Sequence, residues 1–191
     1  MTYKNIYTYC VVIGLLLLQF TPADARQSGN GISGQINCVA INPPNKYAGT
    51  ANGVYVLTKE GNEWKQINNG LTNTNVRTLQ IIDNTSRLVA GTENGIFLYR
   101  NEGELWEEHS AGLTIKNVWS LALSGGRLFA GTTNGGIFIS TDHGESWSLS
   151  NNGLPTDAVV YSLDENGEIL YAGTQKGVFI SKDNGATWSQ Q

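Results

Sequence analysis

The feature that most constrains the fold of this chain is a sequence unit that recurs four times. The copies are YAGTANGVYVL (47–57), VAGTENGIFLY (89–99), FAGTTNGGIFIS (129–140) and YAGTQKGVFIS (171–181). Each copy is followed by a Trp, and these are Trp64, Trp106, Trp147 and Trp188, at spacings of 42, 41 and 41 residues. A period of this length predicts an array of like units that pack on one another, because one such unit cannot bury its apolar faces by itself.

Short runs rich in β-branched and aromatic residues fill each repeat, and Gly and Asn separate them. In the third repeat the runs are 118–123, 127–132 and 136–140, and a fourth begins near Ser146. Alternation along the first run places Val118 and Ser120 on one face and Trp119 and Leu121 on the other. Four strands in about 41 residues are typical of a β-propeller blade. We therefore predict an all-β chain, a β-propeller of about four four-stranded blades of roughly 41 residues.

The predicted domains are a signal peptide and a propeller. The propeller covers 26–191, with blades at about 31–69, 70–111, 112–152 and 153–191. Residues 1–25 contain an apolar run, 10–20, that is too short to span a bilayer and is followed by Ala23-Asp24-Ala25. This pattern predicts secretory cleavage after Ala25, a secreted or periplasmic location, and no membrane span after cleavage. Cleavage leaves Cys38 as the only cysteine, so no intrachain disulfide is expected.

The charge of the chain argues against two classes of partner. The 12 Lys and Arg residues are outnumbered by 16 Asp and Glu, the formal net charge is −4, and the basic residues form no cluster. Nucleic acids and anionic membrane surfaces attract concentrated positive charge. Neither is expected as a partner.

Two turns in the later repeats share a motif. STDHGESW (140–147) and SKDNGATW (181–188) both fit S-x-D-x-G-x-[ST]-W, and at this motif the chain resembles the Asp-box, or BNR, repeat family of sialidase-like β-propellers. YRNEGELW (99–106) and LTKEGNEW (57–64) keep the Gly and Trp but lose the Ser and Asp. The resemblance assigns a structural Asp-box role to Ser140, Asp142, Gly144, Ser146, Trp147, Ser181, Asp183, Gly185, Thr187, Trp188, Asn101, Gly103, Trp106, Gly61 and Trp64.

The acid-rich centre of the first box has two interpretations. Asp142, His143 and Glu145 are residue types that bind metals, but adjacent turn residues fan outward and no second cluster supplies more ligands. An Asp two residues before a Gly can instead accept hydrogen bonds within its own turn. We expect that structural role, and neither a metal nor a cofactor. Each box Trp is expected to lie between blades, and Trp188, in the last blade, is expected to be the most tolerant of substitution unless the ring closes.

The family resemblance also raises a catalytic alternative. Sialidases of this family use three Arg, a Tyr–Glu nucleophile pair and an Asp acid on six blades. Of the Arg residues here, only Arg77 is placed on a first strand where it can face a central channel, and no Arg-Ile-Pro motif precedes the repeats. We therefore expect no catalytic residues, with a sialidase-like glycoside hydrolase as the alternative. Residues 151–174 also resemble periplasmic sensor propellers, and a photosystem II assembly-factor propeller is a further relative.

The expected function is a non-catalytic binding or scaffold module for an exported protein or a polysaccharide. In a propeller, the loops after the fourth strand and those between strands two and three share one face, and here they are rich in Asn and Gly with few charges. Amide side chains both donate and accept hydrogen bonds, although Asn also serves simply to form turns. The candidate binding residues are Asn75, Arg77, Asn117, Trp119, Asp157 and Tyr161.

The repeats are all in phase, so no strand from one end of the chain is available to complete a blade at the other. Four blades can close a ring, but Asp-box rings usually have more. An incomplete ring exposes two apolar sheet faces, which favours association. Two alternatives are therefore expected: a homodimer that completes the ring, or a longer propeller of which this chain is one part.

Overall fold

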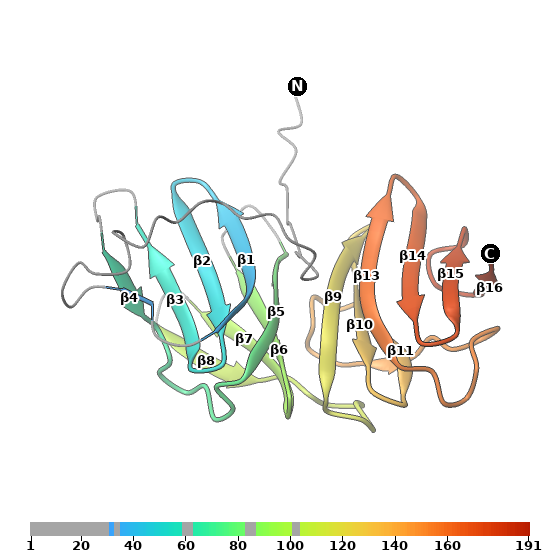
Figure 1. The fold of residues 1–191 in the computed structure, drawn as a ribbon, viewed down its shortest axis with the longest axis horizontal. Helices are drawn as coiled ribbons and strands as arrows, with labels where there is room; N and C mark the ends of the chain where they lie inside the picture. The colour runs from blue at the N-terminus through green and yellow to red at the C-terminus, as the bar shows by residue number, and fades with distance from the viewer. Residues whose placement is uncertain (1–30, 33–34, 59–62, 83–86, 101–103) are drawn as a thin grey trace.

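The computed structural model describes residues 31–32, 35–58, 63–82, 87–100 and 104–191. These form four separate four-stranded antiparallel sheets (Figure 1). The first sheet contains β1 (Ile36–Asn42), β2 (Asn45–Thr50), β3 (Gly53–Leu57) and β4 (Trp64–Gln66). The second contains β5 (Val76–Ile81), β6 (Leu88–Thr92), β7 (Gly95–Arg100) and β8 (Leu105–Glu108). The third contains β9 (Val118–Ser124), β10 (Arg127–Thr132), β11 (Gly136–Ser140) and β12 (Ser148–Leu149), and the fourth β13 (Val160–Asn166), β14 (Ile169–Thr174), β15 (Gly177–Ser181) and β16 (Ser189–Gln190).

Each sheet is a simple meander in chain order, and the sheets follow one another as propeller blades. The prediction of an all-β propeller with four four-stranded blades is confirmed. The first strands β1, β5, β9 and β13 contact one another in sequence, so they form the inner edge of the array. No helix in the described part of the chain has the length and apolar character to cross a bilayer. The predicted signal peptide, Gly61, Asn101 and Gly103 lie outside the described residues.

The first strand of every blade contains a bulge that the sequence pattern did not reveal. On β9 and β10, Thr132 pairs with Val118 and Gly131 with Ser120, so Trp119 has no opposite partner. The same shift occurs on β1, β5 and β13. The extra residue turns Val118 onto the face of Leu121, where both are buried in one cluster. The expectation that Val118 shares a face with Ser120 was wrong, because alternation assumes an uninterrupted strand.

Three apolar cores join the four blades in chain order. The first lies between the first and second blades, the second between the second and third, and the third between the third and fourth. At each junction a Val of the inner strand meets a Gly of the preceding blade: a Cβ on Gly49, Gly91 or Gly131 would lie 2.7–2.8 Å from the Val side chain. These Gly residues therefore allow the sheets to pack closely.

The box Trp side chains point toward the preceding blade. Trp106, Trp147 and Trp188 are buried, and the indole N–H of each donates across the junction, to Ile67 O, His109 O and Ser150 Oγ at 2.5, 3.0 and 3.4 Å. Trp64, in the first blade, is only half-buried. The structure thus reverses the expected order: Trp188 is fully packed, and the first blade has the least embedded Trp, because the direction of packing sets which end of the array is open.

The ring is not closed. None of the three apolar cores, which are built from described residues, joins the fourth blade to the first. Figure 1 shows the first two blades and the last two as an open arc.

Candidate functional site

The candidate site is built on the bulged position of the inner strands. Asn37, Arg77, Trp119 and Tyr161 occupy this one position in the four blades, where the register of each strand shifts. A bulge redirects its side chain away from the regular alternation. The four side chains are therefore released from the inter-blade cores and follow one another along the inner edge of the array.

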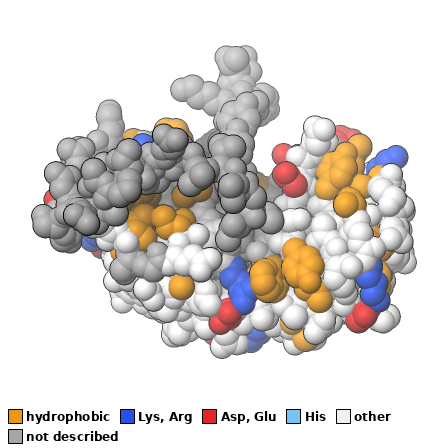
Figure 2. Space-filling view, in the orientation of Figure 1, with side chains coloured by type: hydrophobic (Ala, Val, Ile, Leu, Met, Phe, Trp, Pro, Cys, Tyr) orange, Lys and Arg blue, Asp and Glu red, His pale blue; other side chains and the backbone are white. Residues whose placement is uncertain are grey.

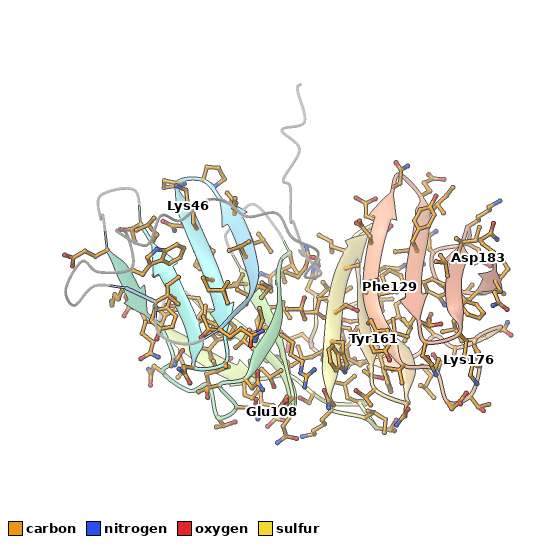
Figure 3. The ribbon with its side chains drawn as sticks, viewed as in Figure 1. Lys46, Glu108, Phe129, Tyr161, Lys176 and Asp183 are labelled. Atoms are coloured by element: carbon orange, nitrogen blue, oxygen red, sulfur yellow. The ribbon has the colours of Figure 1, made fainter. Side chains whose placement is uncertain are left out.

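Three of these side chains form a continuous row. The guanidinium carbon of Arg77 lies 3.9 Å from the centroid of the Trp119 ring, a cation–π contact. The Trp119 and Tyr161 rings meet edge to face, with centroids 5.7 Å apart and planes at 89°. Tyr161 is 45% exposed. Figure 3 labels Tyr161 in the lower half of the molecule, and Figure 2 shows hydrophobic side chains in that half beside basic and acidic ones. We name Arg77, Trp119 and Tyr161 the inner row.

Two residues hold the inner row in place, one in the β6–β7 turn and one in the β10–β11 turn. Glu93 accepts a 2.5 Å ion-pair hydrogen bond from Arg77, and Thr133 Oγ1 accepts the indole N–H of Trp119 at 2.6 Å. The pKa of Glu93 is lowered, chiefly by the Arg77 hydrogen bond and further by one from the Asn75 side chain. The row is thus preorganised by bonds that run from the first strand of a blade to the turn between its second and third strands.

The structure brings together most of the predicted binding residues. Arg77, Trp119 and Tyr161 are in direct contact, and Asn75 reaches the site through Glu93. Asp157 lies in the fourth blade, where Lys176 Nζ donates to it at 2.5 Å. The carbonyl of Asn117 accepts the N–H of Thr133, so this residue supports the turn through its backbone.

Sequence reasoning missed Glu93 and Thr133. Both stand two residues after the Gly of the AGT triplet, as do Ala51 and Gln175 in the other repeats. Gln175 binds the segment that precedes β13: its side chain accepts from Val159 N and donates to Asp157 O, both at 2.7 Å. This shared position in the four repeats is the sequence signal that could have identified Glu93 and Thr133.

Part of the Asn-rich loop surface is occupied by turn-forming bonds. Asn68 Oδ1 accepts from Val54 N at 2.8 Å and its amide donates to Asn52 O at 2.9 Å. Asn151 makes the equivalent pair with Ile137 N and Gly135 O. For these two residues the turn-making interpretation describes the geometry, since their amides already bind the hairpin beside them.

The Asp-box turns lie at the other end of the third strand. In the third blade, Thr133 precedes β11 and the box follows it. Asp142 accepts from Ser146 N at 3.0 Å and Ser146 Oγ at 2.5 Å, while Ser140 Oγ donates to Asp142 and accepts from Gly144 N. In the fourth blade Asp183 likewise accepts from Thr187 N, Thr187 Oγ1 and Ser181 Oγ, and Ser181 Oγ accepts from Gly185 N.

These bonds set the charge state of both carboxylates. The pKa of Asp142 is lowered to about 2, first by the Ser146 hydroxyl, and that of Asp183 to about 2, first by the Thr187 hydroxyl. Donors to a carboxylate favour its ionised form. His143 is not among the residues of this network. Its backbone occupies the left-handed region, with φ 60°. Across the described residues, no group of three or more His, Cys, Asp or Glu side chains is arranged to hold a metal ion.

The blades define a β-propeller, and two of its turns have the geometry of Asp boxes. A family model described as BNR/Asp-box repeat matches residues 138–149 and 179–190, which contain both complete boxes. The chain therefore carries two BNR/Asp-box repeats, as the motif predicted. A comparison with curated proteins finds no match to the chain.

Solved structures share the fold at low sequence identity. An ancestral GH74 enzyme aligns with a TM-score of 0.70 and 22% identity over 85% of this chain and 25% of its own. The extracellular domain of BT4673 from B. thetaiotaomicron gives 0.68 and 21% over 82% and 22%. The computationally designed Ika4 protein gives 0.60 and 18% over 79% and 92%. The chain thus spans about a quarter of the length of the first two.

Proposed function

We propose that this protein is a non-catalytic binding module of the cell exterior, and that its ligand lies along the inner row. The observation that carries the proposal is the contact of Arg77, Trp119 and Tyr161 across three consecutive blades. Aromatic rings offer a large, rigid surface at low entropic cost, and an exposed Tyr also presents a hydroxyl. A row of this kind suits an extended ligand that crosses several blades.

The chemistry of the surroundings favours a neutral ligand, a glycan strand or an uncharged polypeptide segment. The charge within the row is already paired, Arg77 with Glu93, and in the fourth blade Lys176 is paired with Asp157. A ligand therefore meets rings, amides and hydroxyls rather than a net field. The extracellular placement of the BT4673 domain and the predicted signal peptide support a location outside the cytoplasm.

The acid–base properties of the site speak for binding rather than hydrolysis. A glycosidase needs one carboxylic acid whose pKa is raised, so that it can protonate the leaving group. Glu93, which binds the inner row, and Asp157, in the fourth blade, have lowered pKa values, chiefly because of hydrogen bonds from Arg77 and Lys176. Both carboxylates are thus stabilised as anions. Fold similarity to a GH74 enzyme does not carry its chemistry over to this chain.

Binding of the purified chain to an array of neutral and acidic polysaccharides and to an uncharged peptide library tests the proposal. Tyr161→Ala and Trp119→Ala should each weaken the strongest interaction at least tenfold, because each removes a ring of the platform. Leu149→Ala is the matched control, since Leu149 is an exposed apolar residue of an outer strand. Binding should change little between low and high salt.

Asn75→Ala should weaken binding less than either ring substitution, because Asn75 acts through Glu93, and Asn117→Ala should change it little, because its backbone carbonyl is retained. Two results would count against the module. Binding that survives both ring substitutions would place the ligand elsewhere. Saturable release of sugar from any of these polysaccharides that is lost in Arg77→Ala would instead identify a hydrolase.

A further inference from the structure

The two ends of the array expose faces that are buried everywhere else. We call the face of a blade toward its predecessor the leading face, and the opposite one the trailing face. On the trailing faces of the first three blades, Tyr47, Val89 and Phe129 are at most 2% exposed, whereas the equivalent Tyr171 is 37% exposed. At a second trailing position, Val54, Ile96 and Ile137 are fully buried, whereas Val178 is 46% exposed.

The leading face of the first blade is open in the same way. Val76, Val118 and Val160, which enter the Gly sites of the preceding blades, are fully buried, but the equivalent Ile36 is 48% exposed. Correspondingly, a Cβ on Gly173 would meet only Ser162, with no Val side chain from a following blade. The first blade thus presents an unused apolar side chain, and the fourth presents the unused Gly site that receives such a side chain at the other three junctions.

Charge distinguishes this pair of faces from the three packed junctions. Lys46 replaces a Leu that is buried in the leading faces of the other blades, at Leu88, Leu128 and Leu170. Asp164 replaces the small or polar trailing-face residues Ala40, Gln80 and Ala122. At the packed junctions, the residues equivalent to Asp164 and Lys46 share a core. Ala40 lies in one core with Leu88 at the first junction, and Ala122 with Leu170 at the third. A blade junction built from the two open faces therefore brings Lys46 and Asp164 into one core with opposite charges.

We propose that a second copy of this chain covers both open faces, its first blade on the fourth blade of the partner and the reverse, in a two-fold ring of eight blades. Each new junction reuses the register of the existing ones, so the packed blades need not move. Closure within one chain would require all three packed junctions to bend further.

Exchange of the two charges tests the proposal directly. Light scattering on the purified chain should give the mass of a dimer. Lys46→Asp places two acids at each new junction, and Asp164→Lys places two bases, so each variant should raise the dissociation constant at least tenfold. Mixing the two variants should restore the dimer, because the introduced acid of one variant then faces the introduced base of the other, and the native Lys46 and Asp164 meet at the second junction.

Controls separate this arrangement from its alternatives. Far-ultraviolet circular dichroism should show that both variants remain folded, since Lys46 and Asp164 are exposed in the single chain. Val178→Asp should also break the dimer, and Leu149→Asp, at an exposed apolar residue of an outer strand, should leave it intact. A wild-type chain that stays monomeric at high concentration would overturn the proposal. So would a dimer that tolerates Lys46→Asp, Asp164→Lys and Val178→Asp, or variants that remain monomeric when mixed.

Discussion

Substitution of the box Trp residues tests the direction in which the blades pack. The Trp106 ring is 2% exposed, lies 5.0 Å from the ring of Tyr99, and donates its N–H to Ile67 O. Burial of such a ring removes roughly 200 Å² from water, which corresponds to about 5 kcal/mol at 25 cal/mol per Å². The remaining Ala stays buried and the unfolded chain already hides part of the ring from water, so Trp106→Ala should lower the free energy of unfolding by about 4 kcal/mol. Trp64 is half-buried, and Trp64→Ala should cost about 1 kcal/mol.

Urea unfolding followed by far-ultraviolet circular dichroism measures both values, at a concentration where light scattering shows a monomer. Trp188→Ala should behave like Trp106→Ala, because Trp188 is equally packed against its preceding blade. Trp119→Ala serves as the control for loss of a Trp outside the boxes. Equal losses at Trp64 and Trp106 in the monomer, or a small loss at Trp188, would refute the assignment of the leading face.

Three further predictions concern the turns and the Gly sites. Asp142→Ala should lower the free energy of unfolding by about 1 kcal/mol at neutral pH, since it removes turn hydrogen bonds at an exposed site, and should leave ligand binding intact; loss of binding at full stability would assign Asp142 to the site instead. Because the folded pKa values of Asp142 and Asp183 are lowered from 3.8 to about 2, their stabilising contribution is complete above pH 4 and is lost as pH falls from about 4 to 2; acid titration of Asp142→Asn by circular dichroism should show a shallower loss, and an unchanged profile would contradict the pKa assignment. Gly91→Ala should lower the free energy of unfolding by about 2 kcal/mol through its clash with Val118, and Gly173→Ala should lower it distinctly less in the monomer, as measured by thermal unfolding. Equal losses would mean that the neighbouring blade does not set the tolerance of this position.

Much of the fold could be predicted because the sequence repeats its turn chemistry. The expected strands 127–132 and 136–140 coincide with β10 and β11, since Gly and Asn mark both ends of each run. The fourth strand of the third blade was placed near Ser146 and begins at Ser148, because the box turn extends through its closing hydroxyl. Local turn signals fix the edges of strands well when each repeat supplies an independent copy.

Other features depend on information that a repeat pattern does not contain. Periodicity is the same whichever neighbour a blade faces, so it could not show that Trp188 packs backward onto the third blade. Alternation could not reveal the bulge at Trp119. All four repeats carry the same bulge, so it changes neither the composition of the strands nor the spacing between repeats. The candidate list did include Arg77, Trp119 and Tyr161, but the contacts among them, and the roles of Glu93 and Thr133, follow only from the bulged backbone.

The hydrogen bonds that join neighbouring blades have a mechanical consequence. Leu121 N to Thr78 Oγ1, Trp106 Nε1 to Ile67 O and Trp188 Nε1 to Ser150 Oγ join residues 43, 39 and 38 positions apart, about one repeat in each case. Every junction thus closes a loop of similar length, and none ties distant parts of the chain together. Tension applied to the two ends is borne by the terminal blades first. The array then comes apart one blade at a time from its ends, and each release lengthens the chain by nearly the same amount.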